Sequence, residues 1–353
     1  MKITVLGAGA IGKAYAAYLS SRGHLVTIWS PSGRALGRLS SGGVLSATGI
    51  CEGEFQVTVA SDAAAALAGA DLLVVAVPAN GHATVISAIA PHLKNGQTVI
   101  ISAELSFSAV LMAQAIKARG LDVPVIAWAT TVVTAKSSGA DSVAVSLLRK
   151  RLDVASIPAG HVTAAAELCA DVFGVAFDEK PSVMATALSN LNPPAHMAIA
   201  LCNFTRMEKG EDWSSYGGIT EGAGKLMEAL DEERLALAAS FGLSVRSVFD
   251  HYVHSFGVER GSVGQMAQTV AAARPHVKGP ATLDTRFVTE DVPFGLYPLV
   301  ELGRLAGVKM PLHESGVELF SALYGRNFRA ENDILPQLRL EEMSRAQLLD
   351  LVG

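Results

Sequence analysis

The feature that most constrains the fold is a glycine-rich turn near the beginning of the sequence, Gly7-Ala8-Gly9-Ala10-Ile11-Gly12. A short apolar run over 2–6 precedes the turn, and a helical pattern over 13–21 follows it. Gly7 permits a tight turn, Gly9 lets the backbone approach a phosphate without an intervening Cβ, and Gly12 allows the helix to pack on the strand. The first N–H groups of the helix then face the phosphates. The pattern predicts a dinucleotide site contacted by Gly7, Gly9, Ala10, Ile11 and Gly12.

Apolar strand-like runs alternate with helical segments through the first half of the chain. Gly23 ends the first helical segment, and residues 24–29 form a second apolar run, which completes a β-α-β unit. The later strand-like runs are 71–77, 98–102, 123–128 and 142–147. This alternation predicts an α/β Rossmann domain with a doubly wound parallel sheet. In such a unit the glycine-rich turn strongly indicates a dinucleotide site, and an ordinary glycine turn is the weaker alternative.

The pattern changes after about residue 178, where the segments become long and helix-like. These segments are 185–207, 222–241, 244–256, 292–306 and 312–324. A chain of 353 residues also exceeds the size at which one hydrophobic core usually keeps growing. We therefore predict a dinucleotide-binding Rossmann domain over 1–180 and a mainly α-helical substrate domain over 181–353, with the boundary at Lys180-Pro181-Ser182.

The composition excludes several classes of protein. Half of the residues are apolar, yet no apolar run approaches the ~18 residues that span a bilayer, and the N-terminus lacks a signal-peptide pattern. We therefore expect no membrane association and a cytoplasmic location. The net charge of -5 comes without a basic block, which argues against nucleic-acid binding and favours small-molecule substrates. A homodimer is compatible with this composition.

The cysteines do not predict a metal site or a disulfide framework. The chain has three, Cys51, Cys169 and Cys202, which are too few and too scattered for either. We interpret them as buried small hydrophobic residues, and we expect no metal. His251 and His254 have a spacing that suits a metal, but no third ligand lies nearby in the sequence.

The segment after the second strand bears on the choice of cofactor. An NAD-preferring enzyme usually places an acidic residue there for the ribose 2′-OH, whereas this chain has Ser30, Ser32 and Arg34. Hydroxyl groups and a guanidinium suit a 2′-phosphate, so we predict that NADP(H) is preferred over NAD(H). The alternative is that Arg34 is a solvated helix residue and that either cofactor is accepted. Val77 and Pro78 end a later strand and are expected to contact the nicotinamide half.

Two segments of the second half carry candidate catalytic groups. Residues 189–196 place two amides and two prolines before His196 in an otherwise apolar helical segment, which is costly unless a site needs them. A hydrogen-bonded core histidine is the alternative for His196. Residues 285–295 bring together Arg286, Glu290 and Asp291, for which a capped helix with surface charges is the alternative.

These segments together resemble the octopine/nopaline (opine) dehydrogenase family. The matching patterns are Asn190-x-Asn192-Pro193-x-x-His196, Tyr216-Gly217-Gly218-Ile219-Thr220, Asp231-Glu232-Glu233-Arg234 and Arg286-x-x-x-Glu290-Asp291-Val292-Pro293. The resemblance implies an enzyme that condenses the α-amino group of an amino acid with an α-keto acid, pyruvate or 2-oxoglutarate, and reduces the imine with NAD(P)H. It also implies that His196 is the general acid/base, that Asp291 is its carboxylate partner and that Arg286 binds a substrate carboxylate.

These roles also agree with elementary chemistry. Reduction of an imine needs a proton donor, and histidine has the unperturbed pKa nearest neutrality. A carboxylate on the other ring nitrogen fixes the tautomer, and a planar guanidinium grips an anionic substrate. Asn192 lies one helical turn before His196, where it either orients the substrate or the histidine, or caps a broken helix.

Two other functions remain open at this point. A ketopantoate- or 2-hydroxyacid-type reductase shares the opening domain and often uses a lysine, for which Lys225 is the candidate. A regulator that binds NADP(H) without turnover belongs to a different class of protein, and His196, Arg286 and Asp291 would be surplus in it.

Overall fold

The computed structural model describes residues 1–352 and divides into two compact units. Unit 1 comprises Met1–Ala187 and the residues from Ala346 onward, and unit 2 comprises Leu188–Arg345. The division falls within helix α6 (Val183–Ser189), beyond the expected boundary at residue 180. Most of the C-terminal helix α17 (Arg345–Val352) groups with unit 1 and not with the helical domain, because its Asp350 and Leu351 line the same cavity as Val110 of that unit.

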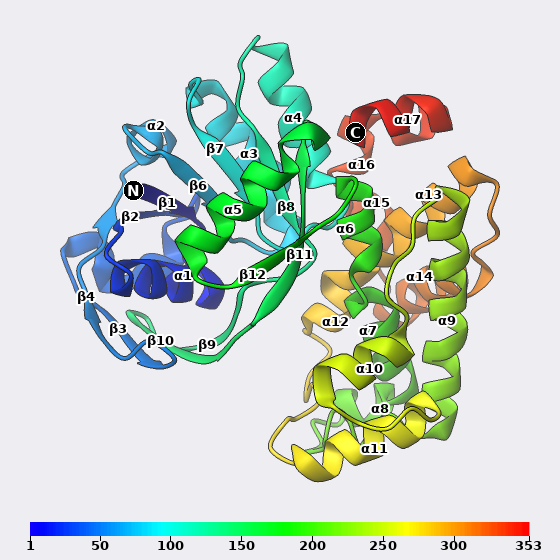
Figure 1. The fold of residues 1–353 in the computed structure, drawn as a ribbon. Coiled ribbons are helices and arrows are strands. Elements are labelled where there is room, and N and C mark those ends of the chain that lie inside the picture. The colour runs from blue at the N-terminus through cyan, green and yellow to red at the C-terminus, as the bar shows by residue number, and fades with distance from the viewer. Residues whose placement is uncertain (353) are drawn as a thin grey trace. The chain divides into compact units, whose positions relative to one another are not determined.

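Unit 1 is built on an eight-stranded sheet in the order β12-β11-β8-β7-β6-β1-β2-β5 (Figure 1). Its six parallel strands are β8 (Val125–Trp128), β7 (Thr98–Ile101), β6 (Leu72–Val75), β1 (Lys2–Leu6), β2 (Leu25–Trp29) and β5 (Thr58–Val59). Strand β11 (Arg151–Ile157) is antiparallel to β8, and β12 (Ala176–Glu179) is parallel to β11. Strand β2 lies on one side of β1 in the sheet, and β6, which comes later in the sequence, lies on the other side of β1. This topological switch point confirms the doubly wound Rossmann fold.

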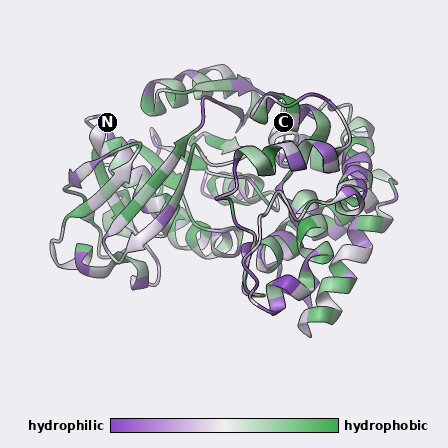
Figure 2. Cartoon of the chain, turned by 90° about the horizontal axis from the view of Figure 1, so that it is seen from below, coloured by the Kyte–Doolittle hydropathy of each residue, from purple (hydrophilic) through white to green (hydrophobic). Residues whose placement is uncertain are grey.

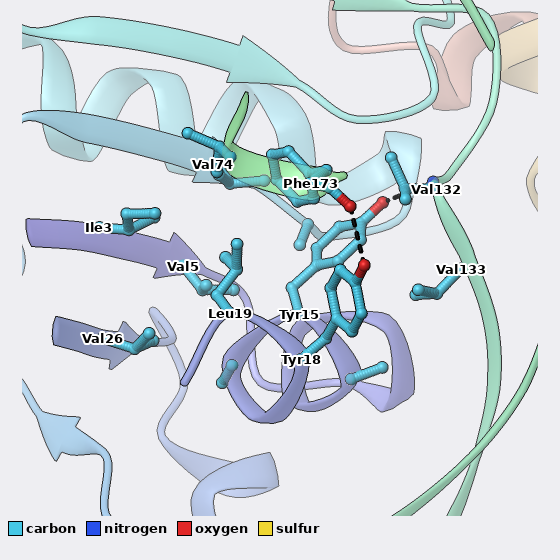
Figure 3. Packing of buried hydrophobic residues seen from close by; sticks show 14 of the residues in the cluster. Ile3, Val5, Tyr15, Tyr18, Leu19, Val26, Val74, Val132, Val133 and Phe173 are labelled. Atoms are coloured by element: carbon cyan, nitrogen blue, oxygen red, sulfur yellow. Dashed lines mark hydrogen bonds between the residues drawn. The ribbon is translucent and has the colours of Figure 1, made fainter. Parts of the chain in front are cut away.

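Helices cover both faces of this sheet. Helices α1 (Ala10–Ser21) and α5 (Val162–Phe173) lie on one face, and α2 (Ala63–Leu67), α3 (His82–Ile89) and α4 (Ser108–Ala118) lie on the other (Figure 1). Buried side chains of β1 and β6 pack against Tyr15, Leu19 and Phe173 on the first face (Figure 3). The Tyr18 hydroxyl donates to the Phe173 carbonyl at 2.8 Å, and the Val132 N–H donates to the Tyr15 hydroxyl at 3.0 Å. Helix α1 is therefore fixed both by apolar packing and by buried hydrogen bonds.

A second, four-stranded sheet belongs to the same unit and was not predicted. Its order is β4 (Gly53–Phe55), β3 (Leu45–Gly49), β10 (Ser142–Leu148) and β9 (Val133–Gly139). The expectation that 142–147 joins the parallel sheet was therefore wrong. A tight connection after Gly139 leads directly from β9 to β10, and such a hairpin joins antiparallel strands, whereas a parallel crossover needs a dozen or more residues.

Unit 2 is helical, as predicted. Its helices carry both apolar and polar residues (Figure 2). Its main helices are α7 (Asn192–Cys202), α8 (Phe204–Glu208), α9 (Glu221–Ser240), α10 (Val248–Phe256), α11 (Val263–Ala273), α12 (Arg286–Thr289), α13 (Tyr297–Ala306), α14 (Pro311–Tyr324), α15 (Phe328–Glu331) and α16 (Leu335–Leu338). The expected single helix over 185–207 is broken into α6, α7 and α8. Pro193 and Pro194 explain the first break, because proline is tolerated in the first turn of a helix but not in its interior.

Several smaller expectations can be compared with the described residues. None of the helices within 1–352 is both long enough and apolar enough to cross a bilayer. Cys51 and Cys169 are buried, but Cys202 is exposed at the end of α7, so its interpretation as a core residue was wrong. His254 contacts the Asp250 carbonyl of its own helix at 2.6 Å, and residues 1–352 contain no group of three metal-ligating side chains.

Candidate active site

The glycine-rich turn joins β1 to α1 under tight packing. Gly7 has a φ of +128°, and a Cβ there would lie 2.6 Å from the Ala76 carbonyl oxygen. A Cβ on Gly12 would overlap the Gly7 carbonyl oxygen. Gly9 differs, because it is exposed and no protein atom lies within 4 Å of its Cβ position. Packing therefore explains Gly7 and Gly12, whereas the missing side chain of Gly9 keeps the outer face of the turn open to a ligand.

The beginning of α1 fits the pyrophosphate of a dinucleotide. Gly9 is the N-cap, no side chain caps the helix, and its first turn contains no acidic residue. The first N–H groups of a helix have no partner within the helix and carry a partial positive charge. Ala10 and Ile11, the first two helical residues, are only partly buried. The backbone here has the donors that an anion requires.

The segment after β2 forms an exposed turn without carboxylates. The Gly33 N–H donates to the Ser30 carbonyl at 3.1 Å, and the Arg34 N–H contacts the Ser32 hydroxyl at 3.4 Å. Arg34 begins a short 3₁₀ segment, η1 (Arg34–Ser41), and its side chain is exposed. The same segment carries Arg38, which the sequence analysis missed although it follows Arg34 by four residues. Asp141 holds Arg38 through a 2.7 Å ion pair.

Val77 and Pro78 follow β6 at the sheet edge where the glycine-rich turn follows β1. The two strands are parallel neighbours, so their carboxyl ends meet. A Cβ on Gly7 would lie 2.8 Å from the Val77 side chain, which places Val77 directly against the turn. Pro78 is exposed. The structure thus brings Val77 together with the glycine-rich turn.

In unit 2, His196 and Asp291 form a close pair. His196 lies on α7, and Asp291 directly precedes the π-helix η5 (Val292–Leu296). The His196 Nδ1 lies 2.6 Å from the Asp291 Oδ2, and the side chains are 23% and 8% exposed. Burial raises the pKa of the Asp291 carboxyl above its usual value, although His196 opposes this shift. With Nδ1 donating to Asp291, the other ring nitrogen of His196 is left for proton transfer.

Phe287 stacks on the imidazole of His196, a contact that the sequence analysis did not find. The ring centroids lie 3.7 Å apart and the rings are inclined by only 6°. Phe287 belongs to the one-turn helix α12, which begins after Thr285. Stacking keeps the imidazole plane parallel to the phenyl ring, and the hydrogen bond to Asp291 keeps the imidazole from turning in its own plane. The only sign of this contact in the sequence is that an aromatic residue directly follows Arg286.

Arg286 and Glu290 form a second pair on the same segment. The Arg286 Nε contacts the Glu290 Oε2, and the side chains are 68% and 6% exposed. The carboxylate therefore lies inside and the guanidinium reaches solvent, where it can meet an anionic substrate. Asn192 is exposed at the start of α7, and the side chain that binds a backbone N–H there is that of Asn190, at 3.0 Å from the Asn192 nitrogen. Lys225 is exposed on α9.

Buried polar groups outside this cluster hold its elements in place. Arg234 is fully buried, forms an ion pair of 2.6 Å with Asp231 and also donates to the Leu188 carbonyl, just before the segment that carries His196. Asn332 donates to the Pro293 carbonyl of η5 at 2.8 Å. The motif Asp231 to Arg234 is therefore structural in this chain. The first contact supports the backbone at the end of α6, before the helix that carries His196, and the second supports η5, directly after Asp291.

Comparison with known proteins identifies the family. A family model described as NAD/NADP octopine/nopaline dehydrogenase, alpha-helical domain, matches residues 179–324, and one described as ketopantoate reductase PanE/ApbA matches residues 3–146. A curated opine dehydrogenase from Arthrobacter sp. (strain 1C) is 31% identical over 352 residues, which cover 99% of this chain and 98% of that protein. The chain belongs to the opine dehydrogenase family. It is accordingly an NAD(P)-dependent oxidoreductase.

Solved structures of similar proteins agree with the fold of this chain. An octopine dehydrogenase structure with NADH and pyruvate gives a TM-score of 0.80 at 16% identity and covers 99% of this chain and 98% of that chain. A yersinopine dehydrogenase with NADP⁺ bound gives a TM-score of 0.72 at 18% identity, with coverages of 97% and 98%. These likenesses confirm a Rossmann domain followed by a helical domain. The ketopantoate reductase model matches the first of these domains and does not extend to the second.

Proposed function

We propose that this opine dehydrogenase condenses the α-amino group of an amino acid with an α-keto acid, pyruvate or 2-oxoglutarate, and reduces the resulting imine. The observation that carries the proposal is the 2.6 Å His196–Asp291 pair, because it supplies a proton donor and acceptor within the helical domain. The nearby guanidinium of Arg286 supplies a site for a carboxylate. Among the similar structures, octopine dehydrogenase is described with NADH and L-arginine and with NADH and pyruvate.

The proposed cofactor residues all lie in unit 1. The pyrophosphate would be held by Gly7, Gly9, Ala10, Ile11 and Gly12, the adenosine ribose by Ser30, Ser32 and Arg34, and the nicotinamide half by Val77 and Pro78. When bound, the reduced nicotinamide supplies the hydride. The absence of a carboxylate from the Ser30–Arg34 turn supports a preference for NADP(H), with NAD(H) as the second cofactor.

The proposed chemistry needs one proton transfer to the protein and one from it. The amino acid must lose a proton before its nitrogen attacks the keto carbon, and the neutral imidazole of His196 accepts that proton. After the attack, one nitrogen proton moves to the former carbonyl oxygen and makes it a hydroxyl. The imidazolium of His196 then gives its proton to this hydroxyl, which leaves as water when the C=N bond forms. The Asp291 carboxylate stabilises the imidazolium that exists between these steps. Arg286 would hold the substrate carboxylate, and Asn192, which is exposed one turn before His196, would orient the amine.

An assay with paired substrates tests this function. Purified protein and NADPH are mixed with pyruvate or 2-oxoglutarate, with and without each amino acid, and cofactor oxidation is followed by its absorbance. We expect oxidation that depends on the amine, and a product with the mass of the keto acid plus the amino acid less one oxygen atom. Equal oxidation without the amine would instead indicate a keto-acid reductase. No turnover with any pair would favour a cofactor-binding regulator.

Changing Arg34 to alanine tests the cofactor preference. We expect the Kd of NADPH to rise by about tenfold or more, because a charge-assisted hydrogen bond to the 2′-phosphate is lost, while the Kd of NADH stays within about twofold. Both constants can be measured from nicotinamide fluorescence. Lys94→Ala is the matched control, because this exposed cation lies in the loop before β7, at the amino ends of the parallel strands and away from the carboxyl ends that the glycine-rich turn follows. Equal weakening of both cofactors would remove the basis for the preference.

A further inference from the structure

The loop after β7 contains a fully buried carboxyl group that the chemistry above does not use. Glu104 has no exposed surface. Its neighbours Ala103, Ser106 and Phe107 have φ values of +67°, +55° and +60°, which residues other than glycine rarely adopt. Such backbone strain persists only where the surrounding structure enforces it, and it concentrates at functional sites. The surrounding structure therefore holds this loop in a strained conformation, at the carboxyl end of the sheet, where cofactors bind in this fold.

Buried side chains connect Glu104 to the end of the neighbouring strand β6. The Ser108 Oγ lies 3.4 Å from the Glu104 Oε2 and 2.8 Å from the His82 Nδ1. On its other side, the His82 Nε2 lies 3.1 Å from the Val77 carbonyl oxygen. His82 and Ser108 are the first residues of α3 and α4, and both side chains are buried. The chain of contacts thus crosses from one strand end to the next.

The hydrogen bonds of this series can all be donated in one direction, from Glu104 through Ser108 and His82 to the Val77 carbonyl. A carbonyl oxygen only accepts, so the proton of a neutral His82 ring is on Nε2. Nδ1 then accepts from the Ser108 hydroxyl at 2.8 Å, which is a shorter contact than the 3.0 Å between that hydroxyl and the Leu105 carbonyl. Burial raises the pKa of Glu104 to about 8, so its carboxyl group carries a proton at neutral pH. The protonated carboxyl can donate from Oε2 to the Ser108 oxygen, and its Oε1 still accepts from the Ala109 N–H at 3.4 Å. The polar groups of all three side chains are thereby satisfied without a buried charge.

We propose that His82 is a positioning residue for the nicotinamide end of the cofactor, acting through the Val77 carbonyl, and that Ser108 and Glu104 hold its ring in place. The inference rests on the proposed placement of Val77 and Pro78 beside the nicotinamide. The carbonyl that His82 binds belongs to the residue whose side chain lies against Gly7. A carboxamide is recognised by directed hydrogen bonds, so the orientation of this peptide affects its affinity.

Ligand binding without substrates tests the proposal. The variants are His82→Phe, which keeps a flat ring but removes both hydrogen bonds, and Ser108→Ala, which removes one hydroxyl. The matched control is His92→Phe, an exposed histidine of the same unit. The Kd values of NADH, NADPH and ADP-ribose are measured by calorimetry. For His82→Phe we expect both reduced cofactors to bind about tenfold more weakly, and ADP-ribose, which lacks the nicotinamide, to bind within about twofold of wild type.

Two results would overturn the proposal. Equal loss of affinity for all three ligands would show that His82 only maintains the domain, and unchanged affinity for NADH and NADPH would show that the Val77 carbonyl does not need it. If His82→Phe does not fold, Ser108→Ala decides by the same comparison, with a smaller selective loss expected. Because no amino acid or keto acid is present, failure of the opine assay would leave these outcomes unaffected.

Discussion

His196→Gln is expected to lower kcat by about 10² to 10⁴-fold, because glutamine cannot transfer a proton at neutral pH. Glutamine retains an amide that can donate to the buried Asp291 carboxylate, so the variant avoids the unpaired charge that His196→Ala would leave. The Kd of NADPH should stay within about twofold of wild type, since the proposed cofactor residues lie in unit 1. Steady-state kinetics and cofactor fluorescence measure the two quantities.

His276→Gln is the matched control for this substitution. His276 is an exposed histidine of the same unit, so its replacement removes an imidazole without touching the His196–Asp291 pair. Wild-type turnover in the control together with loss in His196→Gln supports the acid/base role. If His196→Gln retains full turnover, or loses NADPH affinity and thermal stability together, the histidine is a structural residue and the proposed mechanism fails.

Local sequence patterns are informative where their spacing reflects local structure. The glycine-rich turn is predicted from the first twelve residues alone, and the structure shows why Gly7 and Gly12 must be glycine there. The His196–Asp291 pair spans 95 residues of sequence, and only the family resemblance joined its members in advance. From the local sequence pattern alone, His196 could also be a hydrogen-bonded histidine in the hydrophobic core, because that pattern does not indicate which distant side chain contacts it.

Features that depend on tertiary packing were not predictable in the same way. The stack of Phe287 on His196 joins two helices, and its sequence signal is a single aromatic residue. The contacts among His82, Ser108 and Glu104 join the ends of two neighbouring strands. In the sequence His82 and Ser108 look like ordinary helix-start residues, and Glu104 looks like a loop residue. The second sheet was missed because the apolar alternation of 142–147 is the same in a hairpin as in a parallel strand.

Arg286→Ala is expected to raise the KM for the keto acid by about 10- to 100-fold and to lower kcat, because a charge-assisted bond to the substrate carboxylate is lost. The substitution also leaves the buried Glu290 without its cation, which by itself disturbs the segment that carries Asp291. The double variant Arg286→Ala/Glu290→Gln separates these effects. If Arg286 binds substrate, the double variant regains thermal stability but not keto-acid affinity.

A substrate without the carboxylate sharpens the test of Arg286. Wild-type enzyme should prefer the α-keto acid to the matching α-keto amide, because only the acid forms an ion pair with the guanidinium. Arg286→Ala should narrow this preference, and Arg286→Lys should restore part of it, since lysine keeps the charge but not the planar fork. Competing the two substrates at equal concentration measures the ratio of their kcat/KM values. A preference that stays the same in all three proteins would assign the carboxylate to another residue and leave Arg286 as the partner of Glu290.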